Sequence, residues 1–280
     1  MAHFKSKKKI LLIVEGGTEK DFFERSFKVF GLSFELVVAS DLYSLYSKME
    51  QYDLACDVKD VLAELVTSGT VKEVLKSKFA YTYLVFDSDL QNKTPAQRGT
   101  DIPIEQSAED DLLKVKKMAE YFTNETDPSI GRLYIDYPMM ESFRYCDSFN
   151  DAAFLTEFIP ISMMKGFKKA ASKKKLAGHY IAEYTKTNFK NLIRSNVKKL
   201  NTVSKTAFEG MPSYEIYQVV SKGASIAEKQ SEMVRSKRML SVINTSLFLL
   251  LDHYGNKNAF YDDLCSDAEE GAVDDNAQTP

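Results

Sequence analysis

Acidic side chains follow two apolar runs of this sequence at the point where each run ends. Glu15 comes directly after the apolar run 10–14, and Asp87 and Asp89 follow the apolar run 83–86. Unbroken aliphatic runs are typical of buried parallel strands, and open α/β sheets bind ligands at the carboxyl ends of their strands. Carboxylates without Cys or His suit hard cations such as Mg²⁺ or Mn²⁺. The spacing therefore predicts a metal site built from Glu15, Asp87 and Asp89.

Each of these carboxylates also has a purely structural interpretation. Glu15 can end a strand and cap the next turn, and Glu19 lies in an expected first helical turn, where the helix dipole favours an acid. Asp87 and Asp89 can bond to their own backbone in a turn. If the chain stays extended, however, both aspartates project to the same side, where like charges repel unless a cation or lysine intervenes. The two glycines after Glu15 also leave room for a ligand.

Two further carboxylates compete for the same edge of the sheet. Asp136 ends a predicted strand at 132–136, and Glu141 follows in a helix expected to begin at Pro138. Asp136 can end the strand without binding anything, and Glu141 can simply favour a helix start. We expect Glu141 to enter the same edge as Glu15 and the aspartates.

Basic residues are concentrated between positions 165 and 199, where the only acid is Glu183. Tyr180, Tyr184 and Phe189 lie among them. Positive charge with interspersed aromatic rings suits a nucleic-acid backbone with stacked bases. A solvated helix face with its aromatic rings in the core, or a surface for an acidic partner protein, explains the same pattern. The basic residues are Lys165, Lys168, Lys169, Lys173, Lys174, Lys175, Lys186, Lys190, Arg194, Lys198 and Lys199.

The composition narrows the class of protein. The 280 residues carry a net charge of −3, so nucleic-acid binding requires a local basic surface. Three scattered cysteines indicate a reducing cytoplasm and no disulfide framework, and the three histidines form no zinc spacing with them. The apolar runs are too short for a membrane span or a signal segment. The sequence contains no GxxxxGK[ST], GxGxxG, GxSxG or HExxH motif.

Alternation of apolar strand patterns with helical patterns predicts an α/β fold over 8–150, with a parallel sheet flanked by helices. Thr18 and Asp21 fit a capping box that starts a helix ending at Gly31. The polar stretch 91–107 is expected to be a loop. We expect strands at 10–14, 34–38, 80–86 and 132–136, and helical segments at 41–66 and 108–123.

The strand signal fades beyond residue 150. We therefore expect a helical subdomain over 151–262 that contains the basic segment 165–199. Residues 263–280 are acidic and poor in large apolar groups, which predicts a disordered tail. The expected helices are 151–158, 161–170, 178–200, 213–221 and 224–254.

The segments 15–19 (Glu-Gly-Gly-Thr-Glu) and 87–89 (Asp-Ser-Asp) together resemble a Toprim domain. In that family a glutamate after the first strand and a DxD pair after a later strand hold Mg²⁺ for phosphodiester chemistry. The segment 137–143 is similar to the Asn-Pro-x-x-Glu element of RloB and OLD-like Toprim nucleases, although Tyr137 replaces the Asn. The segment 179–186 is faintly similar to their late Tyr-x-Lys element.

The resemblance, which covers residues 8–190, implies a metal-dependent nuclease that hydrolyses DNA or RNA. Glu15, Asp87 and Asp89 would ligate Mg²⁺ or Mn²⁺, with Glu141 completing a second site. Glu15 is alternatively the general base, and Lys186 would balance charge on the phosphate. RloB and OLD-like proteins belong to anti-phage abortive-infection systems, which implies a cytoplasmic toxin acting beside a P-loop ATPase. The sequence does not separate DNA from RNA or tRNA, and a homodimer is compatible with it.

Two other functions remain open at this stage. A non-catalytic Toprim-fold subunit that regulates an ATPase would keep the scaffold and bind no metal. A phosphotransfer fold with an aspartate nucleophile ranks lower, because the first strand ends in Glu15 and the Asp87 pair follows the third strand.

Overall fold

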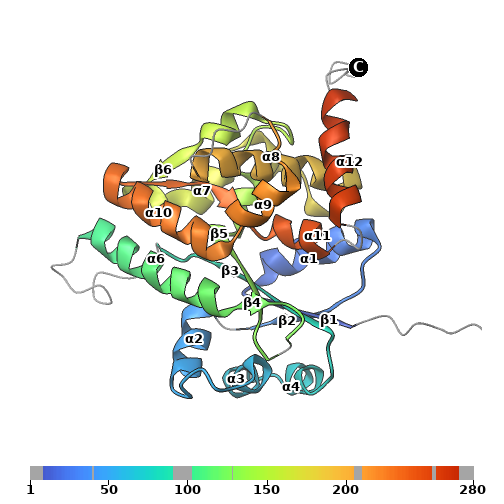
Figure 1. The fold of residues 1–280 in the computed structure, drawn as a ribbon, viewed down its shortest axis with the longest axis vertical. Coiled ribbons are helices and arrows are strands. Elements are labelled where there is room, and N and C mark those ends of the chain that lie inside the picture. The colour runs from blue at the N-terminus through green and yellow to red at the C-terminus, as the bar shows by residue number, and fades with distance from the viewer. Residues whose placement is uncertain are drawn as a thin grey trace, which may run out of the picture.

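The centre of the molecule is a mixed, mostly parallel β-sheet flanked by helices (Figure 1). This computed structural model describes residues 9–39, 41–90, 103–127, 129–204, 210–253 and 257–270. The chain is therefore an α/β protein, which confirms the predicted fold class at that level.

Six strands form the central sheet, in the order β2-β1-β3-β5-β4, with β8 pairing on the carboxyl half of β5. β1, β2, β3 and β5 are parallel, whereas β4 and β8 run antiparallel to β5. β1 is buried along its whole length because it lies between two neighbours and under helices on both faces. The strands are β1 (Ile10–Val14), β2 (Glu35–Val38), β3 (Tyr81–Asp87), β4 (Thr123–Asn124), β5 (Gly131–Tyr137) and β8 (Ile243–Asn244).

Helices from the first half of the chain cover both faces of the sheet. Figure 1 shows α3 and α4 on one side of it and α1 on the other. The predicted helical stretch 41–66 is two helices, because Asp53 and Leu54 adopt positive φ between them. The helices are α1 (Gly17–Phe30), α2 (Leu42–Glu50), α3 (Val58–Leu65), α4 (Gly69–Leu75) and α6 (Ile104–Tyr121).

Two local predictions about these helices are wrong. The N-cap of α1 is Gly16, which makes no side-chain cap hydrogen bond, so Thr18 and Asp21 form no capping box. α6 begins at Ile104, so the end of the expected loop 91–107 is helical, and 91–102 lie outside the described residues.

The second half of the chain is mostly helical but contains short strands. The prediction of a single helix over 224–254 is wrong. α10 ends where Arg238 takes the left-handed conformation, and β7 and β8 follow it. The elements are η1 (Met140–Arg144), η2 (Ala152–Thr156), β6 (Phe158–Pro160), η3 (Ile161–Gly166), α7 (Phe167–Ala171), η4 (Lys175–Gly178), η5 (Ile181–Glu183), α8 (Lys186–Ser204), α9 (Tyr214–Val220), α10 (Gly223–Lys237), β7 (Met239–Ser241), α11 (Leu247–His253) and α12 (Lys257–Glu270).

Other predicted helices differ at their boundaries. The segment 151–158 is a short 3-10 turn followed by β6, and α8 begins at Lys186 instead of residue 178. α12 continues to Glu270, contrary to the predicted disorder from residue 263, and 271–280 lie outside the described residues. None of the described helices is long and apolar enough to cross a membrane.

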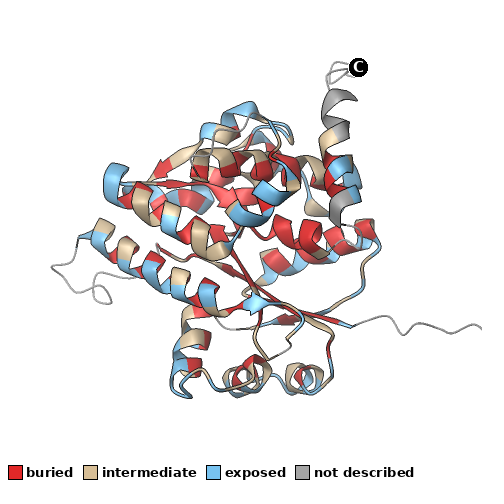
Figure 2. Cartoon of the chain, in the orientation of Figure 1, coloured by how far each residue is buried: buried red, intermediate tan, exposed pale blue. Residues whose placement is uncertain are grey.

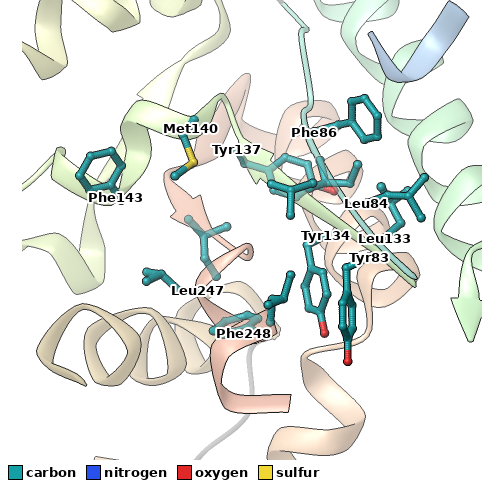
Figure 3. Close-up of a cluster of buried hydrophobic side chains, with 14 of the residues drawn as sticks. Tyr83, Leu84, Phe86, Leu133, Tyr134, Tyr137, Met140, Phe143, Leu247 and Phe248 are labelled. Atoms are coloured by element: carbon teal, nitrogen blue, oxygen red, sulfur yellow. The ribbon is translucent and has the colours of Figure 1, made fainter. Parts of the chain in front are cut away.

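The two halves of the chain share one hydrophobic core. β8 extends the central sheet, α10 packs along α6, and α11 is buried almost throughout (Figure 2). Figure 3 shows part of this core, where the rings of Tyr83 and Tyr134 lie side by side with their hydroxyls pointing the same way. The Tyr134 hydroxyl donates to Asp252 Oδ2 (2.8 Å), which anchors α11 beneath the sheet.

Gly131 at the start of β5 is required by the packing of the sheet. Its φ is +78°, and a Cβ atom there would lie 2.6 Å from Leu84 Cδ1. A larger residue here would be strained by the positive φ, would displace the Leu84 methyl and would lie 3.2 Å from the carbonyl of Thr82.

Candidate functional site

The sheet brings the carboxyl ends of β1, β3 and β5 to one edge. Val14 pairs with Val85, and Asp87 pairs with Asp136, so residues after these strands meet there. Glu15 Oε2 lies 3.4 Å from the backbone N–H of Asp87, which donates to it. We call the residues gathered at this edge the carboxylate cluster: Glu15, Glu19, Asp87, Asp89, Asp136 and Glu141.

Asp87 ties the end of β3 to the segment that carries Glu141. Its Oδ1 accepts a hydrogen bond from the backbone N–H of Met140 (2.7 Å). Burial, followed by the charges of Glu19 and Glu15, raises the pKa of Asp87 well above its usual value. The structure therefore brings Asp87 and Glu15 together, and their negative charges repel each other.

Asp89 does not continue the strand. Its φ is +49°, so the chain leaves the extended conformation and strand alternation does not align Asp89 with Asp87. Ser88 fixes this turn, because its N–H donates to Asp136 O (3.0 Å) and its hydroxyl to Pro138 O (2.9 Å). The charge of Asp89 nevertheless reaches Glu15 and raises its pKa.

Glu15 has a pKa raised to about 8. Burial is the largest cause, the charge of Asp89 is the next, and the N–H of Asp87 opposes both. A carboxyl with this pKa exchanges its proton near neutral pH.

Glu19 joins the cluster from the first turn of α1, and it is only 5% exposed. Burial and then the charge of Glu141 raise its pKa, against the opposing effect of a backbone hydrogen bond. A Cβ atom on Gly16 would lie 3.1 Å from Glu19 Oε2, so this glycine makes room for the carboxylate. The signal for burial was in the sequence, because Phe22 and Phe23 follow at three and four residues on the same helix face.

Asp136 is fully buried, and its pKa is raised to about 8, chiefly by burial. Its Oδ1 accepts from the N–H of Ser246 (3.0 Å), just after β8. Its Oδ2 accepts no hydrogen bond from any described residue. Asp136 therefore has a structural partner on one oxygen and an unsatisfied oxygen on the other.

Glu141 lies in η1, a 3-10 helix and not the α-helix expected from Pro138. It is 3% exposed, and its Oε1 lies 2.6 Å from Lys168 Nζ and 3.9 Å from Arg144 Nη2. Glu141 therefore enters the predicted edge of the sheet, where Lys168 pairs with its charge.

Lys186 does not lie with the carboxylates. Its Nζ is 5.5 Å from the ring centroid of Phe30, the last residue of α1, whereas Glu19 is in the first turn. A helix of this length spans about 20 Å, so the charge-balancing role expected for Lys186 has no geometric basis. Lys168 takes that position, and nothing in the spacing of the lysines singled it out.

The basic segment divides into two parts. Residues 186–199 are largely structural: Arg194 Nε donates to Leu264 O (2.7 Å), and Lys199 is buried and donates to the carbonyls of Phe154 and Glu157. The first part, residues 165–175, carries most of the exposed lysines, and we call these residues the lysine surface: Lys165, Lys168, Lys169, Lys173 and Lys175.

The aromatic residues of the basic segment divide in the same way. Tyr184 and Phe189 are buried in the core, whereas Tyr180 is 74% exposed. The core interpretation is therefore right for two of the three rings, and Tyr180 alone is free to stack.

The donor set of the cluster is entirely oxygen, which fits Mg²⁺ or Mn²⁺. Within the described ranges, however, no three His, Cys, Asp or Glu side chains are already arranged to hold an ion. Asp87, Asp136 and Glu141 each direct an oxygen to a protein partner instead, namely Met140, Ser246 and Lys168.

The sequence matches no protein-family model, and no curated protein or solved structure shows significant similarity to it.

Proposed function

We propose that this protein is a metal-dependent nuclease of the Toprim type, which hydrolyses phosphodiester bonds of nucleic acid. The carrying observation is the gathering of Glu15, Glu19, Asp87 and Glu141 from three strand ends, close enough that neighbouring carboxylate charges raise the pKa values of Glu15, Glu19 and Asp87. Repulsion among buried carboxylates is the condition that a divalent cation relieves.

The residues that would hold Mg²⁺ or Mn²⁺ are Glu15, Asp87 and Asp89, with Glu141 at a second position. A bound cation supplies Lewis-acid stabilisation of charge on the phosphoryl oxygens. Glu15 is alternatively the general base that accepts the proton of the attacking water.

Lys168 replaces Lys186 in the proposed chemistry. It is exposed on one side and pairs with Glu141 on the other, so a phosphate near the cluster would meet its charge. The lysine surface around it offers further contacts to a nucleic-acid backbone. The cytoplasmic anti-phage role and the P-loop ATPase partner are part of the proposal on the strength of the family resemblance.

Cleavage of DNA and RNA in Mg²⁺ or Mn²⁺ tests the proposal, with Glu15→Gln and Asp87→Asn as the site variants. Each should lower the rate on the order of a hundredfold, as loss of a transition-state contact does. Glu50→Gln, an exposed carboxylate at the end of α2, is the matched control and should cleave as the wild type does. Full activity in both site variants, with metal still required, would overturn the assignment.

A second candidate is the non-catalytic subunit that regulates an ATPase. One observation favours it: the described carboxylates are not preorganised to hold an ion. Isothermal titration of Mn²⁺ separates the two functions, because the nuclease requires binding that Asp87→Asn weakens, and the regulatory subunit requires none.

A further inference from the structure

A cleft of about 830 Å³ lies between the outer face of α1 and the segment 177–182. This volume is in the range of small-ligand sites and accommodates a nucleotide. The cleft plays no part in the metal chemistry proposed above, and its walls are charged and aromatic. Its lining includes Asp21, Glu24, Arg25, Lys28, Arg144 and Tyr180.

The cleft adjoins the carboxylate cluster through Arg144. This residue lines the cleft, while its Nη2 lies 3.9 Å from Glu141 Oε1. Its Nε is buried and has no hydrogen-bond partner among the described residues. Arg144 therefore places one end of the cleft beside the cluster.

Two basic residues of α1 face the cleft, one turn apart. Arg25 Nε donates to the carbonyl of Tyr184 (2.8 Å), which fixes the guanidinium, and no described residue pairs with its remaining N–H groups. Lys28 is exposed beside it. Fixed guanidinium donors bind phosphate oxygens in a defined geometry.

The cleft is not purely basic, because Asp21 and Glu24 also line it. Carboxylates accept hydrogen bonds from the exocyclic amino groups of bases. A ligand that carries both a phosphate and a base edge complements this mixture better than inorganic phosphate does.

Tyr180 supplies the aromatic surface at the cleft, and its side chain is 74% exposed, whereas Tyr184, four residues later, is buried. An exposed ring beside basic groups stacks on unpaired bases, and this contact is unavailable to bases already stacked in a duplex. The feature therefore favours single strands over duplexes.

We propose that this cleft binds an unpaired nucleotide of a single-stranded substrate, with the base on Tyr180 and its phosphate at Arg25 and Arg144. The inference rests on the proposed nuclease function and names the substrate class: single-stranded nucleic acid, or a single-stranded loop, delivered to the carboxylate cluster.

Binding in EDTA tests this proposal without requiring cleavage. Fluorescence anisotropy is measured with a labelled single-stranded oligonucleotide, as DNA and as RNA, and with the corresponding duplex. We expect the single strand to bind more tightly than the duplex. Tyr180→Ala should weaken single-strand binding about tenfold, as loss of one stacked base does. Arg25→Gln should weaken it and reduce its salt dependence.

Two control variants keep the test specific. Tyr52→Ala removes another exposed tyrosine, and Arg235→Gln removes an exposed arginine paired with Glu109, and both should bind as the wild type does. Unchanged circular dichroism of Tyr180→Ala excludes unfolding as the cause of a loss. Equal binding of duplex and single strand, no binding of either, or single-strand affinity within twofold of wild type in Tyr180→Ala would overturn the proposal.

The two proposals fail separately. Asp87→Asn should lose cleavage and keep single-strand binding. If it loses cleavage while Tyr180→Ala binds normally, the cleft proposal is wrong and the nuclease stands. If Asp87→Asn cleaves normally while Tyr180→Ala loses binding, the cleft stands and the metal site assignment is wrong.

Discussion

Replacing Glu15 with glutamine should stabilise the metal-free protein, although it removes a residue proposed for function. The pKa of Glu15 is raised from 4.5 to about 8 on folding, mainly by burial and the charge of Asp89. Well below pH 4.5 the carboxyl is protonated in the folded and the unfolded state, so it does not lower the free energy of unfolding. As the pH rises from 4.5 to 8, the unfolded chain releases the proton first, so folding stability is lost across this window.

The magnitude follows from the same values. Between pH 4.5 and pH 7 the loss accumulates over 2.5 pH units at 1.36 kcal/mol per unit, which gives about 3 kcal/mol. Glu15 is partly exposed, and solvent screening lowers this to about 2–3 kcal/mol. A glutamine keeps the acceptor for the N–H of Asp87 and carries no charge. We therefore expect Glu15→Gln to be more stable by that amount at pH 7, a rise in Tm of roughly 5 °C.

Thermal and urea unfolding in EDTA at pH 5, 7 and 8 measure the effect. The gain should fall below about 1 kcal/mol at pH 5, where the unfolded chain keeps much of its proton. Glu50→Gln is the control and should show no such pH dependence. Added Mg²⁺ should stabilise the wild type and narrow its difference from Glu15→Gln, because a ligand bound only to the folded state shifts the equilibrium toward it. A variant less stable than the wild type in EDTA, or a gain that is the same at pH 5 and pH 8, would refute the reasoning.

Three other predictions concern the lysines and the sheet. Lys168→Met should lower the cleavage rate and destabilise the fold by about 1–3 kcal/mol, because it leaves the buried Glu141 without its close partner, whereas Lys186→Met should leave cleavage within twofold of wild type. Gly131→Ala should cost about 1–3 kcal/mol in urea unfolding, since its Cβ would lie 2.6 Å from a leucine methyl at positive φ. Burial lowers the pKa of Lys199 to about 7, so at pH 8 the unfolded chain still binds a proton that the folded protein has released. The free energy of unfolding of the wild type should therefore rise by about 2 kcal/mol from pH 8 to pH 10, as the unfolded chain loses that proton, and Lys199→Met should lack this rise.

The sequence predicted those parts of the fold that local pattern determines. The strands at 10–14, 80–86 and 132–136 are apolar enough to be buried on both faces, and each is present with a shift of about one residue. Because the carboxyl ends of parallel strands lie at the same edge of a sheet, the strand pattern also predicted that Glu15, Asp87 and Glu141 meet at one edge. That inference needed no knowledge of side-chain contacts.

Long-range contacts determine the parts that the sequence did not predict. The stretch 224–254 has helical periodicity, but the side-chain amide of Gln230 bonds both the N–H and the carbonyl of Ser241 and holds the chain in β7. β8 is two residues long and exists because it pairs with Asp136 and Tyr137 of β5. A strand this short has no period for a pattern to detect.

The sequence also did not show which lysine pairs with which carboxylate. Lysines recur through 165–199 with nothing in their spacing to show which one approaches a carboxylate, and the structure selects Lys168 over Lys186. The condition for aligning Asp89 with Asp87, an extended chain, is not met, because Asp89 takes a positive φ.

The contacts around the carboxylate cluster bear on how the chain is divided. Asp136 bonds the N–H of Ser246, Asn244 donates to the carbonyl of Met140 (3.2 Å), and Lys168 pairs with Glu141. Each of these contacts joins the predicted catalytic region 8–150 to the region after it. The C-terminal residues therefore hold the acidic side chains in position, and β8 covers the edge of β5 at the fully buried Asp136. A site assembled in this way depends on the second half of the chain for its electrostatics as much as on the first half for its carboxylates.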